Sequence, residues 1–163
     1  MTYLLDANIF IQAKNLYYNF DICPAFWDWL DRENANGRVF SVDKVLTELL
    51  AGDDSLATWA SERGDSFFLP LSSDIVPSLP VVSRWASNGR YEQAAVNTFL
   101  QVADYYLVAY AHARNLVVVT HELPSSSTKR IKIPDACIAL DVKVMSPYEM
   151  LRTERARFIL GSP

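Results

Sequence analysis

Four carboxylates in this chain stand where they could do chemistry together: Asp6, Glu48, Asp104 and Glu122. Like charges within about 6 Å of one another raise each other's pKa, so a cluster of ionised carboxylates is stable only around a cation. Oxygen ligands without histidine or cysteine favour Mg²⁺ or Mn²⁺ over zinc. A carboxylate-bound Mg²⁺ is suited to displacement at phosphorus, because the ion polarises the phosphate and lowers the pKa of water. The residue types therefore indicate metal-assisted phosphoryl chemistry.

Asp6 is the most conspicuous of the four, because it interrupts an apolar run at residues 3–10. An extended segment entering a core is expected to be apolar, and a buried carboxylate without a partner costs several kcal/mol. Taken singly, each acid also has a structural explanation. Asp6 could cap a helix beginning near Asn8, and Glu48 could be a surface charge. Asp104 could form an ion pair with Arg114 or another cation, and Glu122 could be exposed in a loop.

The elements that would position these acids alternate along the chain. Short apolar or β-branched runs occur at 2–5, 38–42, 116–120 and 142–145. Helical patterns occur at 24–36, 43–52, 91–115, 134–140 and 147–158. The segment 124–134 is loop-like, and within 66–89 only a helix toward the end is expected. This alternation predicts an α/β fold with a mostly parallel sheet and helices on both faces.

Ligands of such sheets bind outside the carboxyl ends of the strands. Asp6 directly follows the run 2–5, and Glu122 follows the run 116–120, so both are expected at that edge. Glu48 lies about one and a half turns into the helix after the run 38–42, close to the same edge. Asp104 lies on a largely apolar face of the helix predicted at 91–115. The sequence therefore predicts one acidic cluster at one edge of the sheet.

Composition places the chain among single globular domains. Its 163 residues are 50% hydrophobic, so we expect one domain over 1–163, with a core at about 3–145 and a C-terminal helix at about 147–158. Two cysteines are too few for a disulfide framework, no segment approaches the roughly 20 apolar residues that span a bilayer, and the N-terminus has no basic signal region. We therefore expect a cytoplasmic protein without membrane contact.

The net charge of −4 argues against a protein that coats nucleic acid through bulk positive potential. The charge is unevenly distributed, since residues 1–111 carry 7 Lys or Arg and 14 Asp or Glu, whereas residues 112–163 carry 8 and 5. The basic groups concentrate in TKRIK at 128–132 and RTERAR at 152–157. A solvated loop and a solvated helix face explain them, but a second interpretation is contact with a nucleic-acid backbone by Lys129, Arg130 and Lys132.

Other kinds of site lack their sequence signals. The chain has five glycines, none in a G-x-G-x-x-G or Walker spacing, and no G-x-S-x-G nucleophile elbow. His112 and His121 do not have the H-E-x-x-H spacing, and we interpret them as surface residues or neighbours of the site. Aromatic residues at helical spacing more often form a core than a base-stacking surface. This applies to Tyr17, Tyr18, Phe26, Trp27 and Trp29.

The ordered set of motifs resembles the PIN-domain family of small α/β, Mg²⁺-dependent ribonucleases. The matching segments are LLDANIFI, which contains Asp6, VFSVDKVLTELL with Glu48, ADYYLVAYA with Asp104, and VVVTHE at the end of a later strand. They extend over about 3–145 in the order of the family. The segments FIQAKNLYYNFDICPAFWDWL and KIPDACIALDVKVMSPYEML look like a prokaryotic PIN-like branch related to the toxins of toxin–antitoxin pairs.

The resemblance implies a PIN-like three-layer α/β/α sandwich whose acidic cluster binds one or two Mg²⁺ or Mn²⁺ ions. By position, the first three metal ligands and catalytic residues are Asp6, Glu48 and Asp104. The implied reaction is hydrolysis of RNA phosphodiesters by a metal-dependent endoribonuclease that needs no protein nucleophile. The implied partners are the RNA substrate, a cognate antitoxin and a second copy of the chain.

The fourth ligand has two candidates. Glu122 matches the family position but is one methylene longer than the usual Asp, a difference in reach of roughly 1.5 Å that a strand-end loop can absorb. Asp135 follows Pro134, the expected first residue of a helix, and the field of that helix already explains an acid there. We therefore assign Glu122 to the metal, with Asp135 as the alternative. Asn8 and Thr120 are expected to orient the site.

Two further interpretations stay open. A phosphatase of the haloacid dehalogenase type would also use an Asp at the end of the first strand, with Thr120 and Lys132 as phosphate contacts. That chemistry normally needs a second Asp two residues after Asp6, where this chain has Asn8. A catalytically weak PIN scaffold would only bind RNA or a protein, and it predicts a missing carboxylate, yet none of the first three is missing.

Overall fold

The computed structural model describes residues 1–161. Within that range the strands are β1 (Tyr3–Leu5), β2 (Val39–Val42), β3 (Phe68–Leu69), β4 (Val117–Val119) and β5 (Val144–Met145). They form one sheet in the order β3-β2-β1-β4-β5, and each neighbouring pair is parallel. The predicted α/β fold with a parallel central sheet is confirmed.

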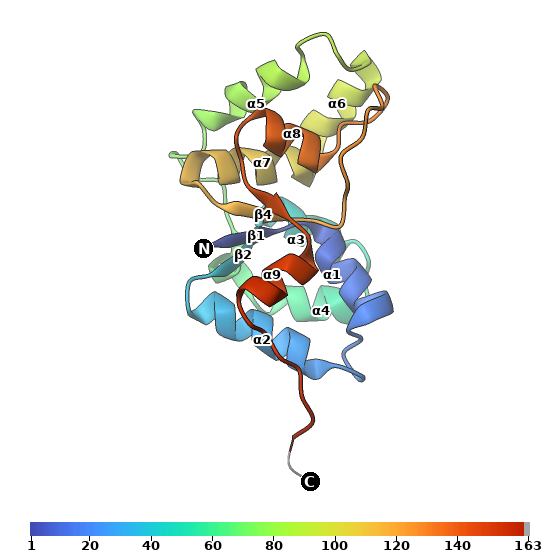
Figure 1. Ribbon diagram of the computed structural model, residues 1–163, viewed down its shortest axis with the longest axis vertical. Helices are drawn as coiled ribbons and strands as arrows, with labels where there is room; N and C mark the ends of the chain where they lie inside the picture. Colours follow the sequence, from blue (N-terminus) through green and yellow to red (C-terminus); the bar gives the residue numbers. More distant parts are fainter. Residues whose placement is uncertain (162–163) are drawn as a thin grey trace.

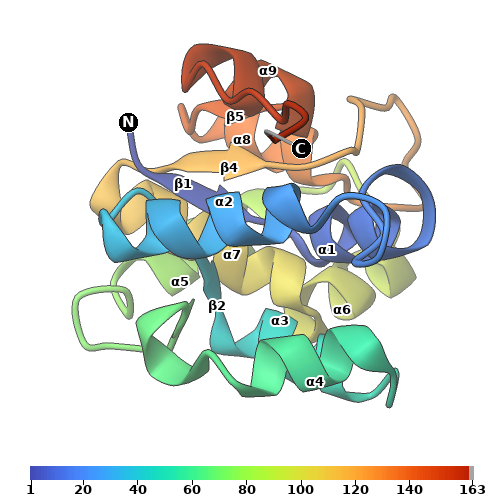
Figure 2. The same ribbon diagram turned by 90° about the horizontal axis from the view of Figure 1, so that it is seen from below.

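Helices cover both faces of the sheet and make the three layers of the sandwich. They are α1 (Ala7–Gln12), α2 (Pro24–Ala35), α3 (Asp43–Leu50), α4 (Ser55–Ser61), α5 (Ser78–Ala86), α6 (Gln93–Gln101), α7 (Ala103–Arg114), α8 (Ile133–Ala139) and α9 (Pro147–Thr153). A π-helical turn, Ala13–Tyr17, extends α1, and a 3₁₀ turn, Gly64–Ser66, precedes β3. Helices α5, α6, α7 and α8 lie on one face, and α1, α2, α4 and α9 lie on the other (Figures 1 and 2).

The central strands are apolar because helices bury them on both sides. The side chains of β1 are fully buried, and those of β4 are almost as inaccessible. In the register of these two strands Leu5 pairs with Val119, so the next residues, Asp6 and Thr120, leave the sheet side by side. The sheet thus places the first acid and its neighbour at the carboxyl edge.

The single helix predicted at 91–115 is wrong, because the chain forms two helices there. Val102, between α6 and α7, has extended backbone angles of φ −110° and ψ 169°. The break places Asp104 in the first turn of α7. Partial charges of the unpaired N–H groups favour a carboxylate at that position.

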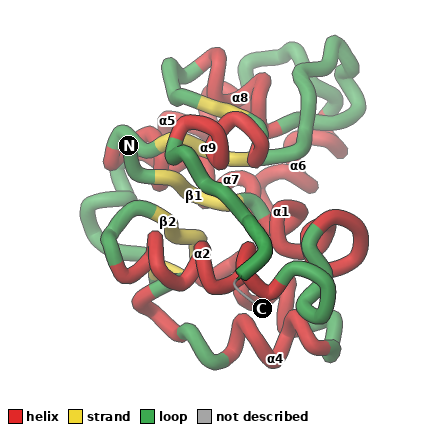
Figure 3. The backbone as a smooth tube through the Cα atoms, turned by 60° about the horizontal axis from the view of Figure 1, so that its bottom comes forward, coloured by secondary structure: helices red, strands yellow, loops and turns green. Residues whose placement is uncertain are grey.

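The C-terminal helix predicted at 147–158 is shorter than expected, since α9 ends at Thr153. Arg155 has a positive φ of 54°, and the N–H of Ala156 bonds back to the carbonyl of Leu151 at 2.8 Å, which ends the helix. The chain then continues as a loop toward α2 (Figure 3). Phe158 packs there against Phe26, with ring centroids 6.1 Å apart.

Several other expectations from the sequence have a structural outcome. Phe26, Trp27 and Trp29 are buried, which confirms that most of this aromatic set belongs to the core, although Tyr17 is 49% exposed. Cys23 and Cys137 are free thiols. Among residues 1–161, no helix combines the length and the apolar character needed to cross a bilayer.

Candidate active site

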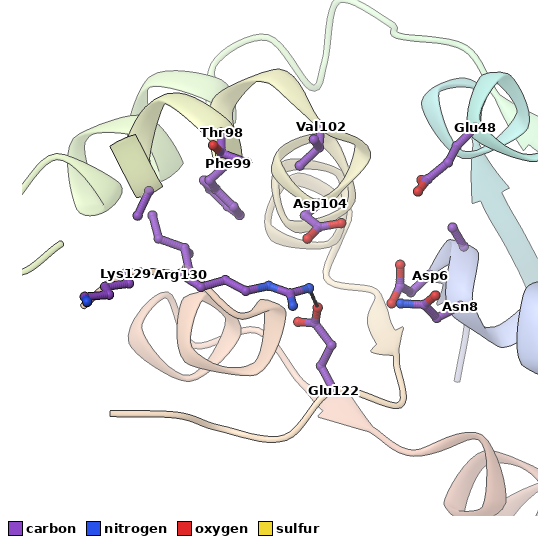
Figure 4. Close-up of a pocket in the computed structure, with 13 residues that line it drawn as sticks. Asp6, Asn8, Glu48, Thr98, Phe99, Val102, Asp104, Glu122, Lys129 and Arg130 are labelled. Carbon is purple, nitrogen blue, oxygen red and sulfur yellow. Dashed lines mark hydrogen bonds and ion pairs between the residues drawn. The ribbon is translucent and has the colours of Figure 1, made fainter. Parts of the chain in front are cut away.

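A cavity of about 380 Å³ opens at the carboxyl edge of the sheet. All four predicted acids line it, from four different places in the chain: Asp6 after β1, Glu48 on α3, Asp104 on α7 and Glu122 after β4. The carboxylates of the first three point toward a common space, whereas Glu122 is turned toward Arg130 (Figure 4). The fold thus brings together acids that are far apart in the sequence, and their role as metal ligands stays a prediction.

Asp6 is the most buried of the four acids, with 3% of its surface exposed. Its N–H donates to the carbonyl of Val119 at 3.0 Å, and its Oδ2 accepts from Thr120 Oγ1 at 2.9 Å. Burial and the negative charge of Asp104 raise the pKa of Asp6 to about 7, although the bond from Thr120 opposes the shift. The hydroxyl of Thr120 therefore holds the Asp6 carboxylate in place without neutralising its charge.

Asp104 is partly buried and faces Asp6 from the opposite side of the cavity (Figure 4). Burial, followed by the charges of Glu122 and Glu48, raises the pKa of Asp104 to about 6, and the charge of Arg130 lowers it. The simpler explanation for Asp104, an ion pair with Arg114 or another cation, is wrong, because no salt bridge of Asp104 is found within residues 1–161. Arg114 instead binds Asp74, with 2.9 Å between Nε and Oδ2.

Glu48 lies on an exposed face of α3, and its carboxylate reaches toward the cavity (Figure 4). Partial desolvation raises its pKa. Its charge in turn contributes to the raised pKa of Asp104. Glu48 is therefore the most solvent-accessible member of the cluster.

Glu122 is not the exposed loop residue of the simpler explanation, because its side chain is only 8% exposed. Its Oε2 accepts a bond of 2.8 Å from the N–H of Ile133, the first residue of α8. Its Oε1 accepts a bond of 3.2 Å from Nη2 of Arg130. Glu122 thus lines the cavity while both of its oxygens have donors.

The alternative fourth acid, Asp135, lies outside the residues that line the cavity. Its carboxylate accepts from the N–H of Ser125, at 3.1 Å to Oδ2. This bond fixes the start of the basic loop, the name used here for residues 124–132.

Asn8 lines the cavity, but no hydrogen bond joins its side chain to Asp6 in the described part of the chain.

The basic loop contributes positive charge to the same cavity. Lys129 and Arg130 line it, but Lys132, at the cap position of α8, does not. The side chain of Lys129 points away from the acids, whereas that of Arg130 extends toward them (Figure 4). Two of the three basic residues predicted for RNA contact therefore border the acidic cluster.

A divalent cation is the cofactor that the sequence implies for this cavity. Within residues 1–161, no group of three or more His, Cys, Asp or Glu side chains is close enough to enclose a metal ion directly. The donors are nevertheless hard carboxylate oxygens, and Mg²⁺ usually keeps several waters and binds through one or two carboxylates. Asp6 and Asp104, whose charges repel one another, fit a partly hydrated ion of that kind.

The wall that α6 and Val102 contribute to the cavity could not be predicted from the sequence. Thr98, Phe99 and Val102 line it, and their residue types carry no chemical signal (Figure 4).

The two histidines lie outside the cavity. His112 Nδ1 is bonded to Ser78 Oγ, and His121 packs between aromatic rings.

Comparison with solved structures shows the same fold in three proteins. VapBC2 from Rickettsia felis, bound to a DNA fragment from its promoter, has a TM-score of 0.54 and 14% identity, over 90% of this chain and 98% of that one. FitAcB from Neisseria gonorrhoeae has a TM-score of 0.54 and 21% identity, over 90% and 99%. FitAB bound to an IR36 DNA fragment has a TM-score of 0.53 and 18% identity, over 90% and 96%. The fold is therefore PIN-like.

Comparison of the sequence with curated proteins finds no match. A family model does match, over residues 3–158, and it is described as a domain of unknown function, DUF4411. The match covers the sheet, all nine labelled helices and every acid that lines the cavity. This PIN-like chain therefore belongs to the DUF4411 family.

Proposed function

We propose that this chain is a Mg²⁺- or Mn²⁺-dependent ribonuclease that hydrolyses RNA phosphodiesters, and that it is the toxin of a toxin–antitoxin pair. The observation that carries the proposal is the convergence of four acidic side chains on one cavity at the carboxyl edge of the sheet. The resemblance to PIN-domain ribonucleases supports RNA as the substrate, a cognate antitoxin as the partner and the cytoplasm as the compartment.

When bound, the cation would supply Lewis-acid activation of the phosphate and an activated water for in-line attack. Asp6 and Asp104 would hold it, and Glu48, across the cavity, would add negative charge. Thr120 fixes the orientation of Asp6 through its hydroxyl. Lys129, at the rim, offers positive charge to the RNA backbone.

The structure weakens the phosphatase alternative. That chemistry needs Thr120 and Lys132 as phosphate contacts, but the Thr120 hydroxyl donates to Asp6 itself and Lys132 lies outside the cavity. The alternative of a scaffold without activity is not favoured by the cavity either, because all four acids face it. Hydrolysis by a hydrated cation remains the chemistry that these side chains suit best.

Cleavage of a labelled single-stranded RNA by the purified protein tests the proposal. We expect cleavage with Mg²⁺ or Mn²⁺, loss of cleavage with EDTA, and an inactive but folded Asp6→Asn variant. Asp141→Asn is the matched control, since it removes one exposed acid outside the cavity. Turnover of phosphate monoesters without RNA cleavage, or full activity of Asp6→Asn, would contradict the proposal.

A further inference from the structure

The acidic cluster contains one ion pair, between Glu122 and Arg130. The carboxylate of Glu122 is almost fully buried, whereas the guanidinium of Arg130 is 63% exposed, and 3.2 Å separates Oε1 from Nη2. The other oxygen, Oε2, is held by the backbone N–H of Ile133 at 2.8 Å. One oxygen of Glu122 is thus held by the backbone of α8, and the other is held by the exposed side chain of Arg130.

Arg130 acts on the rest of the cluster as well as on Glu122. It lowers the pKa of Asp104, against the larger effects of burial and of the neighbouring acids. Lys129 also lines the cavity, but its side chain is directed away from the acids (Figure 4). The positive charge of Arg130 therefore partly compensates the negative charge of the acids, as a bound cation would.

The surroundings of Arg130 allow its side chain to leave without a change in the backbone. The basic loop is fixed before Arg130 by a bond of 2.9 Å from the N–H of Glu92 to the carbonyl of Thr128. It is fixed after Arg130 by Ile131, which is 4% exposed. The guanidinium itself lies mostly in solvent, so it can move away from Glu122 without crossing the protein interior.

We infer that Arg130 is an exchangeable counter-charge of the acidic cluster. In the metal-free protein it neutralises Oε1 of Glu122. It leaves Glu122 when a divalent cation enters the cavity, and its guanidinium then binds a phosphate of the RNA backbone. Guanidinium suits both partners, because its planar donors match carboxylate and phosphate oxygens alike. The inference rests on the proposed function and adds to it a residue that couples cation entry to substrate binding.

The affinity for Mn²⁺, measured by calorimetry without RNA, tests the first half of the exchange. Arg130→Gln removes the competing cation and should tighten Mn²⁺ binding by at least about twofold to fivefold, the range for an exposed ion pair, because here only the Arg130 partner is in solvent. Lys129→Gln, which removes an equal charge from the same cavity, should change it less. In a Glu122→Gln background, Arg130→Gln should have a clearly smaller effect, because the pair no longer exists and only the longer-range action of Arg130 on Asp104 remains.

The affinity for RNA tests the second half. The probe is a labelled single-stranded RNA, and a gel run after each measurement verifies that it is still intact. With Mn²⁺, Arg130→Gln should weaken binding by about threefold or more, since one charged contact to phosphate is lost. With EDTA, Arg130→Gln should bind as wild type does, because Arg130 is then occupied by Glu122.

The possible failures are distinguishable. Equal Mn²⁺ affinity of wild type and Arg130→Gln would overturn the exchange and leave the ribonuclease proposal intact. The same loss of RNA affinity with EDTA as with Mn²⁺ would also overturn it, since Arg130 would then be a permanent phosphate contact. No Mn²⁺ binding by the wild type would overturn the proposed function, and the exchange with it.

Discussion

Replacement of Asp6 by asparagine should stabilise the metal-free protein, and the gain should grow with pH. In the wild type, burial and the charge of Asp104 raise the pKa of Asp6 from 3.8 to about 7. Between those values the folded state binds more protons than the unfolded state, so the free energy of unfolding falls as pH rises. The fall is complete above the folded pKa. Asparagine has almost the same shape and no charge, so the variant should not show this fall.

The size of the effect follows from the two pKa values. Their difference corresponds to roughly 4 kcal/mol, at about 1.36 kcal/mol per pKa unit. Part of the gain is lost, because the new amide N–H₂ of a buried asparagine costs about 1–3 kcal/mol if it finds no acceptor. Its Oδ1 can still accept from Thr120 Oγ1. A net gain of about 2 kcal/mol at pH 8 is expected, or roughly 4–8 °C in melting temperature for a chain of this size.

Urea unfolding in EDTA, at several values between pH 5 and pH 8, measures this gain. The control is Asp141→Asn, which removes an exposed acid at a residue with φ of 57°, a conformation that asparagine tolerates. The control should follow the wild type at every pH. A variant no more stable than the wild type at pH 8, or one whose advantage is the same at pH 5 and pH 8, would refute the electrostatic origin of the effect.

Three further predictions concern the cation, the fourth acid and the basic loop. Mn²⁺ should raise the melting temperature of the wild type, and Asp104→Asn should abolish most of that rise in the same thermal scan, because it removes a proposed ligand that faces Asp6. Glu122→Gln should lower the rate of RNA cleavage tenfold or more, whereas Asp135→Asn should mainly lower the melting temperature, since it binds the N–H of Ser125. Lys129→Ala should reduce the slope of log affinity for single-stranded RNA against log salt by about 0.7, and Lys132→Ala should leave the slope unchanged, because Lys132 lies outside the cavity.

The sheet and its acidic edge could be predicted from the sequence because both depend on local patterns. Apolar runs marked β1, β2, β4 and β5, and Asp6 followed the first of them directly, whereas the two-residue β3 was not predicted. Parallel strands place their carboxyl ends at one edge, so the order of the elements was enough to bring Asp6 and Glu122 into the same cavity. No knowledge of side-chain packing was needed for this step.

Features that depend on tertiary contacts could not be predicted. The helix breaks at Val102, although no glycine or proline lies nearby to mark the break. The local sequence alone therefore favours one continuous helix. The two bonds to Glu122 join it to residues eight and eleven positions later, across a loop whose path the sequence does not reveal. The assignment of Glu122 as a ligand therefore stays a prediction, although its place in the cavity was foreseen.

The energetics of the cluster favour a functional explanation over a structural one. Asp6 is buried near Asp104, and both burial and this neighbour raise the pKa of Asp6. The ionised form of Asp6 therefore lowers the free energy of unfolding of the metal-free protein. A structural role would need only an acceptor for the Thr120 hydroxyl, which asparagine supplies without that cost. The same holds across the cavity, where burial and two acids raise the pKa of Asp104 although Arg130 opposes them. Acids that weaken the fold in this way are typical of sites where binding of a cation recovers the free energy.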